Sequence, residues 1–284
     1  IAGVGGQAVA PAGARLIDFG DATILPGFID AHTHVTSEFN ANYYRGVYDR
    51  LLQSPAEQAL YSARWARRVL DAGFTTVRNL GGNYRVDVGL RNAINAGVVE
   101  GPRILAAVYS IGSTGGHCDS TPWPPERIEP PGVDRGVCNG PEACRQAVRE
   151  QMKYGADVIK ICASGGVLSD AVGVDVPQLT PEELRAIISE AHNWKRKVAA
   201  HSHGDVAARL AIEAGVDSIE HGTFLTEDTL TLMRRKGVYL VPTRMAADWV
   251  GKQADTYPPV IAAKARAAAA GDVKMFRNAL RIGV

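Results

Sequence analysis

The stretch Ile24–Val35 reads ILPGFIDAHTHV, an apolar run that ends in two histidines, His32 and His34. Its β-branched and aromatic residues predict a strand over 28–35. Side chains two residues apart in a strand point to the same face, so both imidazoles share a face near the carboxyl end. Two imidazoles placed in this way can bind one metal ion together. A pair of structural histidines is the alternative, which so short a motif leaves open.

Similar strand patterns recur along the chain, and amphipathic helical patterns separate them. The further strands are predicted over 75–80, 103–110, 157–164, 197–203, 217–222 and 238–243. One helical pattern, over 180–197, opens with Thr180, Pro181 and Glu183, which form a capped helix start. Seven strands alternating with helices predict an α/β fold, a (β/α)8 TIM-type barrel whose last strand is missing from this chain. A doubly wound open sheet is the alternative, but no G-x-G-x-x-G follows the first strand.

Three segments depart from this alternation. Residues 1–24 are glycine-rich and strand-like, which predicts the tail of a small β element beside a barrel domain at 25–284. Residues 280–284, LRIGV, resemble the start of a strand, so we expect a chain that is truncated at its carboxyl end. Residues 111–141 are rich in glycine and proline and follow the third strand, where a long connection is typical of an active-site lid.

Composition excludes several classes of function. A net charge of +1 does not indicate binding to nucleic acid or to an acidic membrane surface. No apolar run reaches the ~18 residues that are needed to cross a bilayer. Four cysteines without a CxxC pair argue against a zinc ribbon or a disulfide scaffold. We therefore expect reduced thiols in a cytoplasmic enzyme, although a bridge between Cys118 and Cys138 stays open. A removed signal peptide also stays open, because the first residue is Ile1.

Three later strands carry further candidate ligands. Lys160 lies inside an apolar strand, where an unpaired ammonium is unfavourable and burial lowers the pKa of the amine. Such an amine can react with carbon dioxide to form a carbamate, which offers two oxygens to metal ions; a lysine that reaches the rim is the alternative. His201 and His203 end the fifth strand and His221 ends the sixth. Ligands at four strand ends favour a metal centre over unrelated structural histidines.

Four motifs together resemble the amidohydrolase superfamily, namely LPGFIDAHTHV, ADVIKICASGGVLS, VAAHSHG and IEHGTFL. They are most similar to its imidazolonepropionase-like branch, which includes Xaa-Pro dipeptidases and carboxypeptidase-type hydrolases. The resemblance runs from about Ala14 to the end of the chain. It implies a (β/α)8 barrel and a small β-sandwich made from both chain ends, of which residues 1–24 would be a remnant.

The resemblance also implies two divalent metal ions, for which zinc suits the ligands best. His32 and His34 would bind the more buried ion. His201 and His221 would bind the second ion, and carboxylated Lys160 would bridge the two. Binuclear hydrolases of this kind cleave an amide bond through a metal-bridged hydroxide.

Four residues are expected near the substrate. The branch places a histidine at the position of His117, where it could donate a hydrogen bond to the scissile carbonyl; a surface histidine is the alternative. His203 shares a face with His201 and could contact the substrate. Arg78 and Arg244 follow the second and seventh strands, and either guanidinium could bind a substrate carboxylate, although a surface ion pair is the alternative for each.

The sequence departs from the branch at three places. The branch has an aspartate at the end of an eighth strand, which also serves as the base, and residues 1–284 contain none because they stop at Val284. Asn79 stands where the branch more often has an acid, and Cys118 stands where glycine is expected. We expect a metal-dependent hydrolase of small peptides or N-acyl amino acids, forming a homo-oligomer and binding neither nucleic acid nor membrane. A cyclic-amide hydrolase of the imidazolonepropionase type and an inactive metal-binding fragment are the alternatives.

Overall fold

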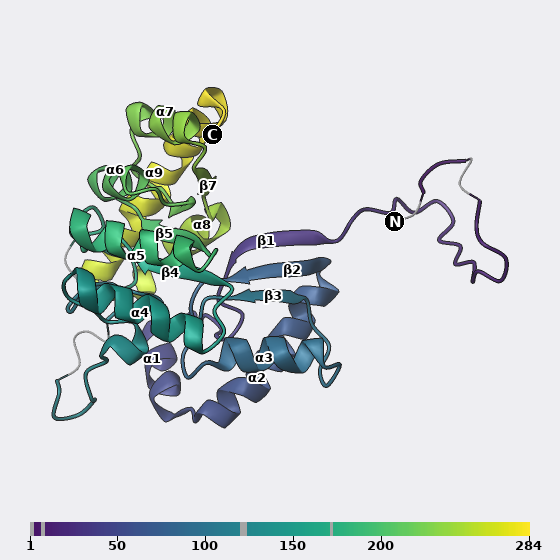
Figure 1. The fold of residues 1–284 in the computed structure, drawn as a ribbon, viewed down its shortest axis with the longest axis horizontal. Coiled ribbons are helices and arrows are strands. Elements are labelled where there is room, and N and C mark those ends of the chain that lie inside the picture. The colour runs from purple at the N-terminus through teal and green to yellow at the C-terminus, as the bar shows by residue number, and fades with distance from the viewer. Residues whose placement is uncertain (1–2, 7–8, 120–123, 171–172) are drawn as a thin grey trace.

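The computed structural model describes residues 3–6, 9–119, 124–170 and 173–284. Within these residues, seven strands lie at the centre of the molecule (Figure 1). They are β1 (Phe28–Thr33), β2 (Phe74–Asn79), β3 (Arg103–Ala106), β4 (Val158–Cys162), β5 (Lys197–Ser202), β6 (Ser218–His221) and β7 (Tyr239–Val241). Each overlaps the range that the sequence predicts for it, so the expected order of strands is confirmed.

The strands form two parallel sheets, β1-β2-β3 and β4-β5-β6-β7. A parallel bridge between Ile111 and Ile161 joins them where the third connection passes β4. The α/β class with parallel strands is therefore confirmed. In the part of the chain that the structure describes, β1 and β7 do not pair, so a closed barrel stays a prediction.

Helices connect successive strands and cover their outer faces. They are α1 (Tyr43–Leu52), α2 (Pro55–Asp71), α3 (Val86–Asn95), α4 (Pro141–Lys153), α5 (Pro181–Asn193), α6 (Asp205–Glu213), α7 (Glu227–Lys236), α8 (Arg244–Lys252) and α9 (Pro259–Ile282), with short 3-10 turns η1 (Val133–Arg135) and η2 (Ala254–Thr256). Helix α5 begins with the predicted capping box, in which the Thr180 hydroxyl accepts from the backbone N–H of Glu183 and the Glu183 carboxylate accepts from that of Thr180.

Strand β4 shows how the sequence divides inner from outer face. Ile159 and Ile161 are fully buried in the large apolar cluster that strands share with the helices. Val158, Lys160 and Cys162 alternate with them and point to the opposite, inner face. This alternation, predicted from the sequence, places the one charged residue of the strand on the inner face of the sheet.

The two chain ends differ from expectation. The described residues of 1–24 contain no strand and run away from the rest of the molecule (Figure 1), so the sandwich remnant is not confirmed. An isolated short strand has no neighbour to pair with and is not stable by itself. Leu280 and Ile282 belong to α9 rather than to a new strand, and Gly283 ends this helix in the left-handed region. A short apolar run is compatible with the period of a strand or of a helix. Here Met275 and Ala279, four residues apart, are both buried, which is the spacing of a helix.

The cysteines also correct the sequence prediction. They form two disulfides, Cys118–Cys162 and Cys138–Cys144, and neither the expected free thiols nor a Cys118–Cys138 bridge is present. Cys118 and Cys162 are 44 residues apart, and only the fold brings their Cα atoms to 6.0 Å. Because free thiols were the reason to expect a cytoplasmic enzyme, the location stays a prediction with less support. Among the described residues, no helix has the length and apolarity to span a membrane.

Candidate metal centre

Six of the seven histidines gather at the carboxyl ends of the strands or in the loop after β3. The ring centroids lie 4.9 Å apart for His32 and His221, 4.7 Å for His201 and His221, and 5.4 Å for His32 and His34. His201, His203 and His221 can each offer a ligand atom within 4.8 Å of the others. The fold therefore brings together both histidine groups that the sequence singles out.

Backbone carbonyls fix the tautomers of two of these rings. Nδ1 of His34 donates to the carbonyl of Gly81 at 3.1 Å, and Nε2 of His201 donates to the carbonyl of Gly165 at 3.1 Å. A carbonyl only accepts, so the proton must lie on that ring nitrogen. The other nitrogen, Nε2 of His34 and Nδ1 of His201, then carries a lone pair for a metal ion.

Side chains hold three more rings by Nδ1 and leave Nε2 available. The Nδ1 of His32 lies 2.7 Å from a carboxylate oxygen of Glu220. The Nδ1 atoms of His203 and His221 lie 2.8 Å and 2.6 Å from the hydroxyls of Thr223 and Thr243. Histidine ligands of metals are typically oriented through the second nitrogen by a carboxylate or another polar group.

Burial keeps these imidazoles neutral. Desolvation, together with the smaller effect of the positive charge of Lys160, lowers the pKa of His34 and of His203 to about 4. Burial likewise holds the pKa values of His32, His201 and His221 well below the ordinary range. A neutral imidazole is the form that binds a metal ion, so the site is prepared for a cation at neutral pH.

Lys160 lies on the inner face of β4 and is 3 % exposed. Burial lowers its pKa to about 8, although the negative charge of Glu220 acts in the opposite direction. Within the described residues, no hydrogen bond or ion pair engages its ammonium group. A pKa of about 8 leaves roughly a tenth of the amine neutral at pH 7, and the neutral amine is the nucleophile that carbamate formation needs.

Glu220, on β6, is a central residue of the site that the sequence prediction missed. Besides His32, its buried carboxylate accepts from Arg78 at 2.7 Å and from the Ser218 hydroxyl at 2.6 Å. Strict alternation would turn either Glu220 or His221 away from the inner face. His221 has a φ of +70°, which breaks the alternation and lets both residues face inward. In the sequence, Glu220 lies two residues after Ser218 and directly before His221, and this spacing was the signal that could have identified it.

Arg78 spans the inner face from β2 to β6. Its Nε donates to the carbonyl of Ala31 at 2.6 Å, and its terminal nitrogens donate to Ser218 and Glu220. Every nitrogen of this guanidinium has a partner within the chain. Its predicted contact with a substrate carboxylate therefore stays a prediction, and its observed contact is with Glu220.

Arg244 begins α8, and its Nε donates to the carboxylate of Asp272 in α9 at 2.8 Å. The guanidinium also lies over the ring of Phe276, 4.9 Å from its centroid. The side chain is 40 % exposed, so its terminal nitrogens can still reach a ligand. Its substrate role likewise stays a prediction.

His117 comes from the loop after β3 and packs on the histidine group. Its ring centroid lies 4.3 Å from that of His201. The buried Nδ1 has no hydrogen-bond partner among the described residues. Burial lowers the pKa of the ring to about 3, so it is neutral. A buried polar atom without a partner calls for an explanation, and a ligand atom outside the chain supplies one.

The donor set fits divalent metal ions. Neutral imidazoles with one nitrogen fixed and one available, next to a buried lysine, are the nitrogen donors that zinc accepts readily. The unsatisfied Nδ1 of His117 adds an observation that does not depend on any resemblance.

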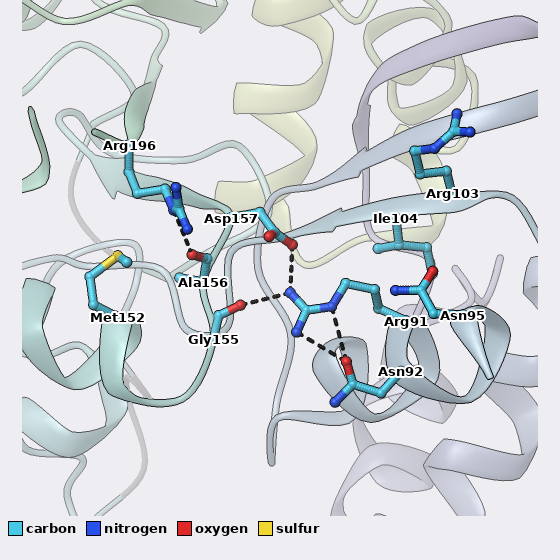
Figure 2. A pocket seen from close by; sticks show the side chains of 10 residues that line it. All are labelled: Arg91, Asn92, Asn95, Arg103, Ile104, Met152, Gly155, Ala156, Asp157 and Arg196. Carbon is cyan, nitrogen blue, oxygen red and sulfur yellow. Dashed lines mark hydrogen bonds and ion pairs between the residues drawn. The ribbon is translucent and has the colours of Figure 1, made fainter. Parts of the chain in front are cut away.

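A pocket of about 600 Å³ lies elsewhere, at the amino ends of β3 and β4 (Figure 2). Arg103 is the first residue of β3, and Asp157 directly precedes β4 and pairs with Arg91 at 2.5 Å. Parallel α/β sheets carry their chemistry at the carboxyl ends of the strands, where the histidines are. This pocket is therefore separate from the candidate metal centre.

The chain is similar to several known proteins. A family model described as "Amidohydrolase family" matches residues 23–284. The ochratoxinase of Aspergillus niger is 32% identical over 274 residues, which cover 92% of this chain and 56% of that protein. A solved Xaa-Pro dipeptidase with bound methionine is 38% identical, with a TM-score of 0.86 over 91% of this chain and 64% of that one. A prolidase complexed with N-methylphosphonate-L-proline is 33% identical, with a TM-score of 0.80 over 95% of this chain and 68% of that one. The chain thus spans little more than half the length of the curated relative.

Proposed function

Because this chain belongs to the amidohydrolase family, we propose that it hydrolyses an amide bond in a small peptide or N-acyl amino acid, with two divalent metal ions as cofactors. The observation that carries the proposal is the set of five inward imidazoles, each with one nitrogen held by the chain and the other available. Relatives named Xaa-Pro dipeptidase and prolidase support a substrate of dipeptide size.

In this proposal His32 and His34 hold one metal ion, and His201 and His221 hold the second. Lys160, carboxylated, would supply oxygen ligands to both ions. When bound, the ions lower the pKa of a coordinated water and polarise the substrate carbonyl.

His203 is assigned to the substrate rather than to the second ion. Its ring lies nearly parallel to that of His221, with 11° between the planes and 4.8 Å between the centroids. Ring nitrogens bind metals in the plane of the ring, so two stacked rings direct their lone pairs along separate planes. The planes of His201 and His221 differ by 71°, and their lone pairs can converge.

The remaining residues orient the reactants. His117, which is neutral and partly buried, can donate one N–H to the carbonyl oxygen of the scissile amide. Arg244 keeps terminal nitrogens available for the substrate carboxylate, whereas Arg78 holds Glu220, which in turn fixes the His32 ring. Proton transfer to the leaving amine is assigned to the acid that the family resemblance implies on an eighth strand, which is not among residues 1–284. A homo-oligomer in the cytoplasm remains part of the proposal.

The test is an activity panel on the purified protein, with metal content measured by mass spectrometry. The panel contains dipeptides with a carboxyl-terminal proline, basic or aromatic residue, N-acyl amino acids, and one cyclic amide. We expect hydrolysis of a dipeptide or N-acyl substrate, loss of activity with a chelator and recovery with zinc. Turnover that a chelator leaves unchanged, or two bound metals without hydrolysis of any substrate, would contradict the proposal.

A further inference from the structure

The Cys118–Cys162 disulfide joins the His117 loop to the strand that carries Lys160. Cys118 directly follows His117, and Cys162 lies two residues after Lys160 on the same inner face of β4. The Cα atoms are 6.0 Å apart although 44 residues separate them. One end of the bond is therefore in a buried strand, and the other is next to the histidine that we place on the substrate.

A second anchor holds the same segment from the other side. The side chain of Gln178 accepts from the backbone N–H of His117 at 2.8 Å, and the Gln178 carbonyl accepts from the Ser113 hydroxyl at 2.6 Å. Gln178 is itself fixed, because its N–H donates to the carbonyl of Ala163 beside β4. The disulfide and Gln178 thus hold the backbone on both sides of one side chain.

The position in which these two anchors hold the His117 ring leaves the ring little room to move. A Cβ on Gly166 would lie 2.2 Å from Cε1 and Nδ1 of His117, so the ring lies directly against this glycine. On its other side the ring packs on His201. A displacement of ~1 Å in a positioning group can lower turnover by ~10²-fold, so a bond that fixes this ring matters for catalysis.

The two disulfides differ in access. Cys138 and Cys144 are 1% and 0% exposed and lie in the main apolar cluster, six residues apart. Cys118 is partly exposed. Thiol–disulfide exchange requires access to a sulfur atom, so a reductant in solution reaches Cys118 first.

We propose that the Cys118–Cys162 disulfide positions His117 and makes the activity sensitive to a dithiol reductant; the catalytic part of this inference rests on the proposed function. The reductant's two thiols are oxidised to its own cyclic disulfide. They deliver two electrons and two protons, which break the bond between the two sulfurs and leave Cys118 and Cys162 as thiols. The segment then keeps its hydrogen bonds to Gln178 but loses its covalent link to β4 at Cys118, and the His117 ring leaves its place on Gly166.

The test measures the accessibility of His117 without relying on turnover. The protein is purified without reductant, then treated with diethyl pyrocarbonate, and each histidine is quantified by peptide mass spectrometry before and after mild dithiol treatment. His192, which is exposed on α5, serves as the internal reference. We expect no free thiol at the start, two thiols at Cys118 and Cys162 after reduction, and a several-fold rise in labelling of His117.

Two variants complete the design. Cys118→Ser should show the high labelling of His117 without reductant, unchanged metal content and turnover lowered roughly tenfold or more. The matched control, Cys138→Ser with Cys144→Ser, should label as the wild type does, both before and after the dithiol is added. If Cys118→Ser does not fold, the reduced wild-type protein provides the same comparison.

Four free thiols in the unreduced protein, or labelling of His117 that reduction leaves unchanged, would overturn the inference. Because labelling needs no substrate, a protein that hydrolyses nothing but shows the labelling change would count against the proposed function alone. A protein that hydrolyses dipeptides equally well before and after reduction would count against the disulfide's role alone.

Discussion

The Nδ1 of His32 on β1 lies 2.7 Å from a carboxylate oxygen of Glu220 on β6, residues that are 188 positions apart in the chain. This contact crosses the inner face and fixes which nitrogen of His32 can bind a metal ion. The same carboxylate also neutralises the positive charge of Arg78, whose guanidinium lies 2.7 Å from its other oxygen. The buried Glu220 carboxylate therefore holds the candidate ligand His32 in one orientation, and Arg78 in turn holds Glu220.

Replacing Glu220 by glutamine should weaken metal binding. Glu220→Gln removes the negative charge that supports His32 and leaves Arg78 without its counter-charge, so we expect metal affinity to fall by ~10–100-fold. Competition against a chelator of known affinity measures this. Glu190→Gln is the matched control, because Glu190 is also buried and pairs with Arg149 but lies on α5, outside the site. Equal metal affinity in both variants would mean that Glu220 is only structural.

Replacing Lys160 by alanine should remove the metal ions. Lys160→Ala deletes the proposed bridging carbamate, and short carboxylic acids should restore part of the metal content by occupying the same space. Lys197→Ala is the control, since Lys197 is an exposed residue of β5. Two metals and full turnover in Lys160→Ala would exclude the bridging role.

Carboxylation of Lys160 should also depend on pH. Carbon dioxide reacts with the neutral amine, whose fraction rises roughly fivefold between pH 7 and pH 8 if the pKa is about 8. We therefore expect zinc to reconstitute metal-free protein in bicarbonate buffer roughly fivefold faster at pH 8 than at pH 7 when both buffers hold the same concentration of dissolved carbon dioxide. The initial rate of recovery of bound metal measures this, and a rate that does not depend on bicarbonate would argue against the carbamate.

The metal-free protein should lose stability as the pH falls below neutrality. Burial lowers the pKa of His34 and His203 to about 4, whereas the unfolded chain has ordinary values near 6.5. Between about pH 4 and 6.5 the unfolded state binds more protons, so the free energy of unfolding decreases by up to ~1.4 kcal/mol per pH unit for each such histidine. Urea unfolding at pH 7 and at pH 5 tests this. Equal free energies of unfolding would mean that the rings are not buried in the metal-free state.

The strand order and the ligand candidates could be predicted from the sequence because both depend on local spacing. His32 and His34, or His201 and His203, share a face in any strand, whatever lies around it. Glu220 was missed because strict alternation turns only one of two consecutive residues inward, and Glu220 and His221 share the inner face only because His221 has a φ of +70°.

Contacts between residues far apart in the chain could not be predicted from the sequence for a different reason. The partner of Cys118 is set by the fold, which places β4 beside the loop after β3. The resemblance marked Asn79 as a departure without explaining it. The structure shows its buried amide oxygen accepting from the N–H of Val35 at 2.7 Å, a backbone contact that fixes the turn after His34.

The position of His117 gives the last prediction. Its ring lies against Gly166, where a Cβ would approach to 2.2 Å, so Gly166→Ala should displace the ring from this position without altering any proposed ligand. We expect turnover to fall by ~10²-fold, as in His117→Asn, with metal content unchanged in both variants. Gly89→Ala is the control, because a Cβ at this α3 position meets nothing within 4 Å. If Gly166→Ala and His117→Asn lose metal in proportion to turnover, His117 is a ligand or a structural residue. If Gly166→Ala keeps full turnover, the ring can move without consequence, and a role in holding the substrate carbonyl would have to be given to His203 instead.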